Sequence, residues 1–153
     1  MGLSIIPIGH VRGGRAEPVD DGWDAVEAAI ELDAAQLGPD AALGLGSFSH
    51  IVVVFVFDRL DPATIERNAR RPRGRLDWPL TGILAQRGAP RPNRLGVTVC
   101  RLLGVEGLRL RVRGLDAIDG TPVLDIKPHM TGFDPRGEIR EPDWAREIMQ
   151  GYW

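Results

Sequence analysis

The stretch Ile51-Val52-Val53-Val54-Phe55-Val56-Phe57 decides the fold. All seven residues are β-branched or aromatic, and such residues favour an extended strand. Apolar side chains occupy both faces of this strand, so we expect it to be central in a sheet and not solvated on one side. The run is also the longest apolar segment of the chain, and it is far too short to span a bilayer.

Short strands are predicted on both sides of this segment. In Leu108–Leu115, leucine and valine alternate with Arg109, Arg111 and Arg113, which is the pattern of a half-buried antiparallel strand. Nineteen glycines and twelve prolines interrupt the apolar runs, and this favours many short strands over a few long helices. Further strands are predicted over Ile5–Val11, Leu95–Leu103 and Thr121–Ile126, with a turn at Gly104–Gly107.

Two further segments complete the predicted architecture. Asp24–Ala35 is rich in alanine and glutamate, which favours a helix, but its apolar residues recur at every second position. The regular alternation favours a strand, because tertiary contacts can override intrinsic propensity. Pro142–Gln150 has proline near its first turn and is predicted to form a short helix. We therefore expect an all-β protein, mainly an antiparallel β-barrel, as a single domain over residues 1–153, with residues 130–153 as a C-terminal tail and helix.

Charge is unevenly distributed along the chain. The net charge of −2 argues against a protein that coats nucleic acid through bulk electrostatics. Arginines are nevertheless clustered, at five positions within residues 67–75 and again at Arg87, Arg91 and Arg94. A local patch of this kind can bind phosphate, whereas the simpler alternative is a solvated loop of arginines. Spacing alone does not separate these two interpretations.

Several classes of site are excluded by their motifs. The three histidines are scattered and no Cys/His grouping has zinc spacing, so no metal is expected. The chain has no Walker loop, no nucleophile elbow and no glycine-rich loop after a first strand, which a Rossmann-type methyltransferase needs. The single Cys100 cannot form an internal disulfide, and with no recognisable signal peptide it predicts a cytoplasmic protein.

Two segments are suited to ligand binding. Pro90-Arg91-Pro92-Asn93 brackets an arginine with prolines, so a stiff backbone would hold guanidinium groups where they can bind a carboxylate or phosphate. The stretch 115–125 carries three carboxylates, Asp116, Asp119 and Asp125, beside an Asp-Gly turn. Each segment also has a structural interpretation, as a surface turn or as turn-forming and strand-face polar residues.

Taken in this order, the segments resemble the TsaA-like (TrmO-type) family. The resemblance rests on Leu45-Gly46-Ser47-Phe48-Ser49-His50 running into the strand at residues 51–57, then on Arg91-Pro92-Asn93 with Leu95-Gly96. Its strongest part is Leu115-Asp116-Ala117-Ile118-Asp119-Gly120-Thr121-Pro122-Val123-Leu124-Asp125-Ile126-Lys127-Pro128. The resemblance implies a β-barrel that binds S-adenosylmethionine without a Rossmann sheet, with the cofactor site close to a homodimer interface.

The resemblance also implies four stretches of cofactor contacts. They are Asp58 and Arg59 at a strand end, Arg87 with Val97, the run Arg113, Gly114, Leu115 and Asp116, and, more loosely aligned, Asp21, Gly22 and Trp23. Arg87 would bind the methionine carboxylate, and Asp116 suits the ribose hydroxyls or the adenine amine. Methyl transfer from a cationic sulfur is an in-line displacement, so positioning can provide most of the acceleration and no catalytic residue is assigned.

The characterised members of this family methylate N6 of threonylcarbamoyl-adenosine beside the tRNA anticodon, and this is the reaction that the resemblance implies. The tRNA phosphates would be bound by Arg70, Arg71, Arg73 and Arg91. Two alternatives stay open: a non-catalytic S-adenosylmethionine-binding module, and a methyltransferase with another acceptor. The first draws on the acidic balance and on Asp58, which stands where the family commonly has histidine. We further expect a short form, without the additional C-terminal domain of many members.

Overall fold

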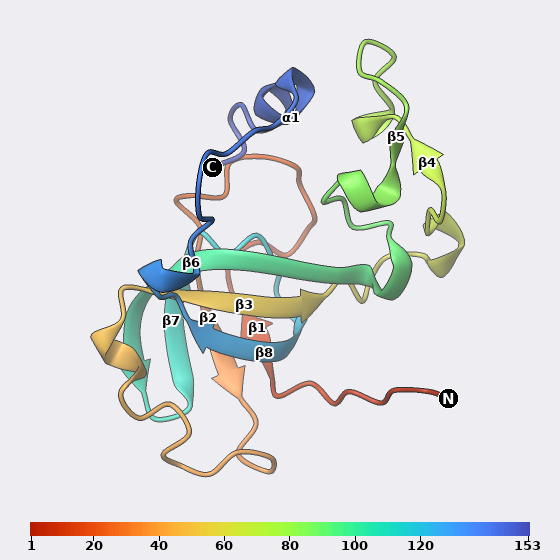
Figure 1. Cartoon of the computed structure of the whole chain (residues 1–153). Helices are drawn as coiled ribbons and strands as arrows, with labels where there is room; N and C mark the ends of the chain where they lie inside the picture. Colours follow the sequence, from red (N-terminus) through yellow and green to blue (C-terminus); the bar gives the residue numbers. More distant parts are fainter.

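The computed structural model describes all residues 1–153. Six antiparallel strands close into a barrel in the order β1-β2-β7-β6-β3-β8, and β8 returns to pair with β1 (Figure 1). A separate two-stranded sheet, β4-β5, and one α-helix lie outside the barrel. The strands are β1 (Gly9–Arg12), β2 (Glu27–Leu32), β3 (His50–Val56), β4 (Ala69–Arg70), β5 (Thr81–Gly82), β6 (Leu95–Glu106), β7 (Arg109–Arg113) and β8 (Pro122–Pro128), and the helix is α1 (Asp143–Ile148). Short 3₁₀ helices span Leu45–Ser47, Pro62–Thr64, Pro72–Gly74, Ile83–Ala85, Pro92–Arg94 and Thr131–Phe133.

The barrel confirms the predicted all-β fold with one short helix. Strand β3 is central as expected, since it pairs with β6 on one side and with β8 on the other. Its side chains at Ile51, Val53 and Phe55 are at most 1% exposed and fill the barrel, while the valines between them face outward. Burying each such large apolar side chain contributes roughly 1.5–3 kcal/mol to folding, and the inward row of β3 packs in one core with residues of the other barrel strands.

The ambiguous segment Asp24–Ala35 contains strand β2, as its alternation predicts. β2 is hydrogen-bonded to β1 on one edge and to β7 on the other. Ala29 and Ile30 are buried in the barrel wall and interior. Two neighbouring strands and burial therefore outweigh the intrinsic helix propensity of alanine and glutamate.

Two predicted boundaries are wrong. The first strand begins at Gly9 and not at Ile5, and the residues before it extend away from the barrel with Ile5 and Ile6 exposed (Figure 1). The predicted turn at Gly104–Gly107 is shorter, because β6 continues to Glu106 and the chain reverses at Gly107, where φ is +60°. The register between β6 and β7 shifts between Leu102 and Gly104, and this bulge accommodates the glycine inside the strand.

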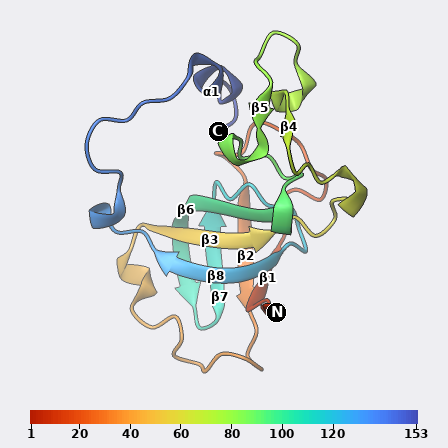
Figure 2. The same cartoon turned by 45° about the vertical axis from the view of Figure 1, so that its right-hand side comes forward.

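Residues 58–94 form a second, smaller body between β3 and β6, which we call the arginine-rich lobe. In both views α1 lies on the side of the barrel where β4 and β5 are found (Figure 1, Figure 2). The buried Trp78 of the lobe donates a hydrogen bond from Nε1 to Glu147 Oε2 of α1 at 2.7 Å. Arg75 lies over the Trp78 ring, 4.0 Å from its centroid. The helix is thereby fastened to the lobe. No helix in the structure is both long enough and apolar enough to cross a membrane.

Replacing Gly96 by alanine is expected to destabilise the barrel. Gly96 lies opposite Phe55 in the β3–β6 pair, and a Cβ at this position would be 2.5 Å from carbons of the Phe55 ring. The ring or the strand must move, so the free energy of unfolding should fall by about 1–3 kcal/mol. Urea unfolding measures this change. The matched control is Gly82→Ala, since a Cβ on Gly82 meets no atom within 4 Å. Equal unfolding midpoints for the two variants would contradict this account of the core.

Candidate functional site

A half-buried carboxylate, that of Asp116, lies just after the end of β7. Its neighbours Leu115 and Ala117 are buried in the core and hold the backbone of Asp116 against the barrel. Thr98, which points inward from β6, donates its hydroxyl hydrogen bond to Asp116 Oδ1. Gly114 has a φ of +79°, a left-handed conformation that glycine adopts without steric cost, and it allows the chain to turn out of β7. The end of β7 therefore places the Asp116 carboxylate, a hydrogen-bond acceptor, beside the apolar interior of the barrel.

The second partner of Asp116 comes from far along the chain. The hydroxyl of Tyr152 donates a hydrogen bond to Asp116 Oδ2. Burial raises the pKa of Tyr152 well above its ordinary value, the Asp116 charge raises it further, and Arg87 and Arg73 lower it by less. The phenol is therefore protonated at neutral pH and can donate this hydrogen bond. Both oxygens of Asp116 are used by hydroxyl groups.

Cys100 lies close to the same carboxylate but is not a reactive group. Burial in the barrel, and then the charge of Asp116, raise the pKa of the Cys100 thiol to about 12. Thiolate, and not thiol, is the nucleophilic form of cysteine. Cys100 is thus a small apolar residue of the core.

The predicted stretch Asp21-Gly22-Trp23 lies next to Tyr152. The backbone N–H groups of Gly22 and Trp23 donate to the carbonyls of Gly151 and Tyr152, at 3.0 and 2.9 Å. Arg15 fixes this stretch from the other side. Its guanidinium donates to the Asp21 and Gly22 carbonyls, both at 2.7 Å, and lies 4.5 Å from the centroid of the Trp23 ring.

Two more predicted stretches reach the same place. Arg87 is exposed and donates from Nη2 to the carbonyl of Val97 at 3.0 Å, and its charge acts on the Tyr152 hydroxyl. Arg113 donates from Nε to the Asp24 carbonyl at 3.0 Å, directly after Trp23. Three of the four stretches expected to hold the cofactor are thus brought together around the Asp116–Tyr152 pair.

The fourth stretch, Asp58 and Arg59, is hydrogen-bonded to other residues than the Asp116–Tyr152 pair. Arg59 donates to the carbonyls of Ala16 and Asp119, at 3.2 and 3.3 Å. The Asp58 side chain is exposed and makes no hydrogen bond or ion pair. Asp119 Oδ1 accepts a hydrogen bond from the Gly13 N–H at 2.9 Å, which is the structural role expected of a turn residue. Loop 13–22 is therefore hydrogen-bonded to both groups of residues, and no hydrogen bond or ion pair joins the two groups directly.

Two arginines of the lobe donate hydrogen bonds to backbone carbonyls of the lobe. Arg71 donates from Nη1 to the carbonyl of Trp78 at 2.5 Å, and Arg91 donates from Nη1 to the carbonyl of Gln86 at 2.6 Å. These bonds hold the lobe, which has only four residues in strands, in one conformation. Arg71 and Arg91 are therefore not fully solvated, and these bonds do not test whether they also bind phosphate.

Arg70 and Arg73 have different surroundings. Arg73 forms an ion pair with Asp21, with 3.0 Å between Nη2 and Oδ1, and so ties the lobe to a predicted cofactor stretch. Arg70 is half-buried, and its buried Nε has no hydrogen-bond partner. Contact of these four arginines with nucleic acid stays a prediction.

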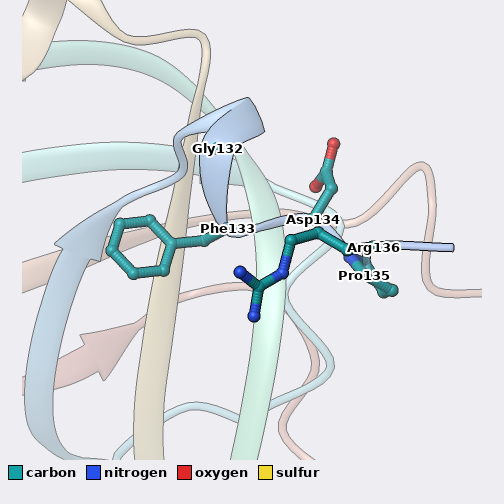
Figure 3. A pocket seen from close by; sticks show the side chains of 5 residues that line it. All are labelled: Gly132, Phe133, Asp134, Pro135 and Arg136. Carbon is teal, nitrogen blue, oxygen red and sulfur yellow. The ribbon is translucent and has the colours of Figure 1, made fainter.

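A surface hollow of about 330 Å³ lies elsewhere, at Gly132–Arg136 after β8 (Figure 3). All of its lining comes from one continuous segment, and the Asp134 carboxylate points away from the Phe133 ring and the Arg136 guanidinium (Figure 3). Ligand sites are usually formed by polar groups that converge from several segments. In contrast to the Asp116 region, this hollow is therefore not formed by polar groups from several segments. The structure also contains no cluster of three or more His, Cys, Asp or Glu side chains that could hold a metal ion.

Comparison with known proteins identifies the family. Residues 16–135 match the family model of the tRNA-methyltransferase O N-terminal domain. The chain belongs to the TrmO N-terminal domain family. The resemblance drawn from the sequence is thereby confirmed, and the match includes Asp21–Trp23, Asp58, Arg87 and Asp116.

Related proteins cover this TrmO-family chain to different extents. A "Probable S-adenosyl-L-methionine-binding protein" of Methanothermobacter thermautotrophicus is 38% identical over 143 residues, which are 90% of this chain and 97% of the relative. The human "tRNA (adenine(37)-N6)-methyltransferase" is 38% identical over 100 residues, which are 65% of this chain but 22% of the human protein. The crystal structure of TrmO from Pseudomonas aeruginosa superposes with a TM-score of 0.70 at 32% identity, over 92% of this chain and 62% of that one. The chain thus spans about a fifth of the mammalian relative's length.

The family resemblance did not reveal three residues of the candidate site. Thr98 carried a signal, since it is the polar member of the inward row Gly96, Thr98, Cys100. Tyr152 and Arg15 carried none, because their partners lie in distant segments that only the fold brings close. Tyr152 is the single tyrosine of the chain, which makes it useful as a probe.

Spectrophotometric titration of Tyr152 is expected to show no ionisation near the ordinary phenol pKa of about 10. Because the folded-state pKa is raised above the unfolded value, the protonated phenol stabilises the fold below about pH 10, and this stabilisation is lost as the pH rises further. Replacing Asp116 by asparagine removes a negative charge beside the phenol, so ionisation should begin at lower pH. The control is Asp125→Asn, a carboxylate paired with Lys127 instead. Wild-type ionisation near pH 10, unchanged by Asp116→Asn, would contradict the described pair.

Proposed function

We propose that this chain is an S-adenosylmethionine-dependent methyltransferase domain that modifies N6 of threonylcarbamoyl-adenosine beside the tRNA anticodon. The observation that carries the proposal is the convergence of Arg87, Asp116 and the backbone of Gly22 and Trp23 on one site. Family membership supports it, as do relatives named for S-adenosylmethionine binding and for adenine-37 N6 methylation.

The side chains at the site fit the polar groups of S-adenosylmethionine. The methionine carboxylate needs a cation, and the exposed Arg87 guanidinium has N–H groups left over beyond its bond to Val97. The ribose hydroxyls need an acceptor, and Asp116 already accepts hydrogen bonds from two hydroxyl groups, those of Thr98 and Tyr152. The carboxylate therefore suits a hydroxyl-bearing ligand.

The residues of the site have a positioning role in this proposal. S-adenosylmethionine, when bound, supplies a methyl group on a cationic sulfur. Arg87 and Asp116 would fix the two ends of the cofactor, and Trp23, buried beneath Arg15, would hold the backbone on which the cofactor rests. Fixing both reactants in line is sufficient for much of the acceleration of a displacement reaction. No residue is assigned as a base.

The arginine-rich lobe is our candidate for the tRNA contact, through Arg70, Arg71, Arg73 and Arg91. Arg71 donates to the carbonyls of Leu76 and Trp78, and Arg91 to that of Gln86, all from Nη1, so the other guanidinium nitrogens of both residues remain for phosphate. Arg73 connects the lobe to Asp21, so phosphate bound here would lie on the same side of the barrel as the cofactor stretch. Arginine side chains that are already held in place by the protein lose less conformational entropy when they bind a phosphate.

We further propose a homodimer through the outer face of β6 and β3. Leu95, Val97 and Val99 of β6 are 37–46% exposed and form an apolar row on the outer face, which ends at the exposed Arg101. The outward valines of β3 lie directly beside them in register, with Val54 opposite Val97. Contiguous exposed apolar surface on a soluble domain marks an interaction site. Val97 also carries the carbonyl that Arg87 contacts, so a second copy on this face would lie beside the cofactor site.

A specific observation favours the alternative of a cofactor-binding module without turnover. Asp58, where the family commonly has histidine, is exposed and has no polar partner, so it fixes nothing at the strand end. Cofactor binding with no transfer to RNA would select this alternative over the methyltransferase.

The first prediction from this proposal concerns binding and transfer by the Arg87→Ala variant. Wild-type protein should bind S-adenosylmethionine saturably in calorimetry and transfer labelled methyl to tRNA that carries threonylcarbamoyl-adenosine. Losing a hydrogen bond to a charged group costs about 1.5–3 kcal/mol, so Arg87→Ala should weaken binding roughly 10- to 100-fold.

The matched control is Arg140→Ala, because Arg140 is exposed and has no hydrogen bond or ion pair. This variant should behave as wild type in both assays. A folded wild-type protein that binds no S-adenosylmethionine at millimolar concentration would refute the proposal. Transfer to tRNA that lacks the threonylcarbamoyl group, at an equal rate, would refute the proposed acceptor.

The second prediction concerns assembly. Wild type should show about twice the chain mass of 16.8 kDa in light scattering, and Val99→Glu should show the single-chain mass, because a charge at the centre of a buried apolar face is costly. Leu43→Glu is the control, since Leu43 is 84% exposed and far from β6 in the sequence. A monomeric wild type, or a Val99→Glu variant that remains dimeric, would show that this face is not the interface.

A further inference from the structure

The last residues of the chain are attached to the candidate cofactor site at three points. We call residues 149–153 the terminal segment. Its carbonyls at Gly151 and Tyr152 accept from the N–H groups of Gly22 and Trp23, and its Tyr152 hydroxyl donates to Asp116. All three partners belong to stretches expected to contact the cofactor. The terminal segment therefore occupies the polar groups that a cofactor would need.

The hydrogen bond from Tyr152 is the kind that a ribose would make. A phenol and a sugar alcohol both offer one O–H donor to a carboxylate oxygen. Asp116 is half-buried beside the core, so leaving its Oδ2 without a donor would be costly. Exchange of one hydroxyl for the other keeps Asp116 satisfied before and after the exchange, which allows the two states to be close in free energy.

The segment can leave without unfolding its surroundings. Its other side chains are largely exposed, with Met149 at 41% and Trp153 at 49%. The helix α1 before it is held separately, through the bond from Trp78 to Glu147. Gly151 has a φ of +74°, so the backbone changes direction within the segment at a residue that tolerates many conformations. Release therefore requires breaking three hydrogen bonds and uncovering one aromatic ring.

We propose that Tyr152 is a latch that occupies the ribose position on Asp116, so that docking of residues 149–153 and binding of S-adenosylmethionine exclude one another. The inference rests on the proposed role of Asp116 in cofactor binding. The docked latch lowers the apparent affinity for the cofactor by the fraction of molecules in which the site is open. The latch also keeps Asp116 hydrogen-bonded in the absence of cofactor.

Calorimetry with S-adenosylhomocysteine tests the energetic part of the proposal. Tyr152→Phe keeps the ring but removes the hydroxyl, so the docked state is weakened and the affinity should rise by up to about tenfold. Trp153→Phe is the control, because Trp153 contacts the Tyr152 ring edge-on but has no bond to Asp116. Its affinity should equal that of wild type.

The single tyrosine allows a direct test in the wild-type protein. Tyrosine labelled with ¹³C at Cζ gives one resonance, that of Tyr152. Saturating S-adenosylhomocysteine should move this resonance to the position of a solvated tyrosine, and the pKa of Tyr152 should fall toward the ordinary value of about 10. Both changes are expected only if the phenol leaves Asp116.

The outcomes separate the latch from the proposed function. Tighter binding by Tyr152→Phe together with release of the Tyr152 resonance supports the latch. Saturable binding with an unchanged resonance, or weaker binding by Tyr152→Phe, overturns the latch and leaves the cofactor site in place. Absence of S-adenosylhomocysteine binding to both proteins overturns the proposed function and the latch with it.

Discussion

A carboxylate beside an apolar core must be hydrogen-bonded, and in this protein the two donors come from distant parts of the chain. Thr98 on β6 and Tyr152 in the terminal segment each give a hydroxyl to Asp116 after β7. The closed barrel makes this possible, because it puts Thr98 on the inner face and holds Leu115 and Ala117 in the core on either side of the aspartate. Anchoring the terminal segment, shielding the site and keeping the Tyr152 phenol protonated all depend on this arrangement.

The residues that stabilise the barrel are largely different from those of the candidate site. Its interior is filled by the inward rows of the strands, with Gly96 leaving room for the Phe55 ring. Several polar groups of the candidate site, among them Asp116, Arg87 and the backbone of Gly22, belong to segments between strands, while Thr98 contributes from within β6. The arginine-rich lobe is organised differently, since guanidinium bonds to carbonyls, such as that of Arg71 to Trp78, take the place of a regular sheet. Its arginines therefore stabilise the lobe whatever else they bind.

Local sequence pattern predicted those parts of the fold in which local and tertiary forces agree. The β-branched run of β3 and the alternation of β2 and β7 report burial that the barrel provides, so these strands were predicted correctly. The errors arise where the decisive contact is not local. Ile5 looks like strand but finds no partner, and Gly104 looks like a turn but is accommodated by a bulge against β7.

The same reason limits what the sequence says of the site. The family motif located Asp116, Arg87 and Asp21–Trp23, which the structure brings together, and also Asp58, whose exposed side chain has no polar partner. A motif does not encode the distant donor of each hydrogen bond. Tyr152 was therefore not predicted, although its pKa is shifted strongly by burial and by Asp116.

The central claim, that the Asp116 region is the cofactor site, is tested most directly by a crystal structure of the protein with S-adenosylhomocysteine. The account predicts that the ribose hydroxyls lie on Asp116 and the carboxylate on Arg87, with Tyr152 displaced from its present partner. Electron density for the ligand at another place, with Asp116 still hydrogen-bonded to Thr98 and Tyr152 alone, would contradict it.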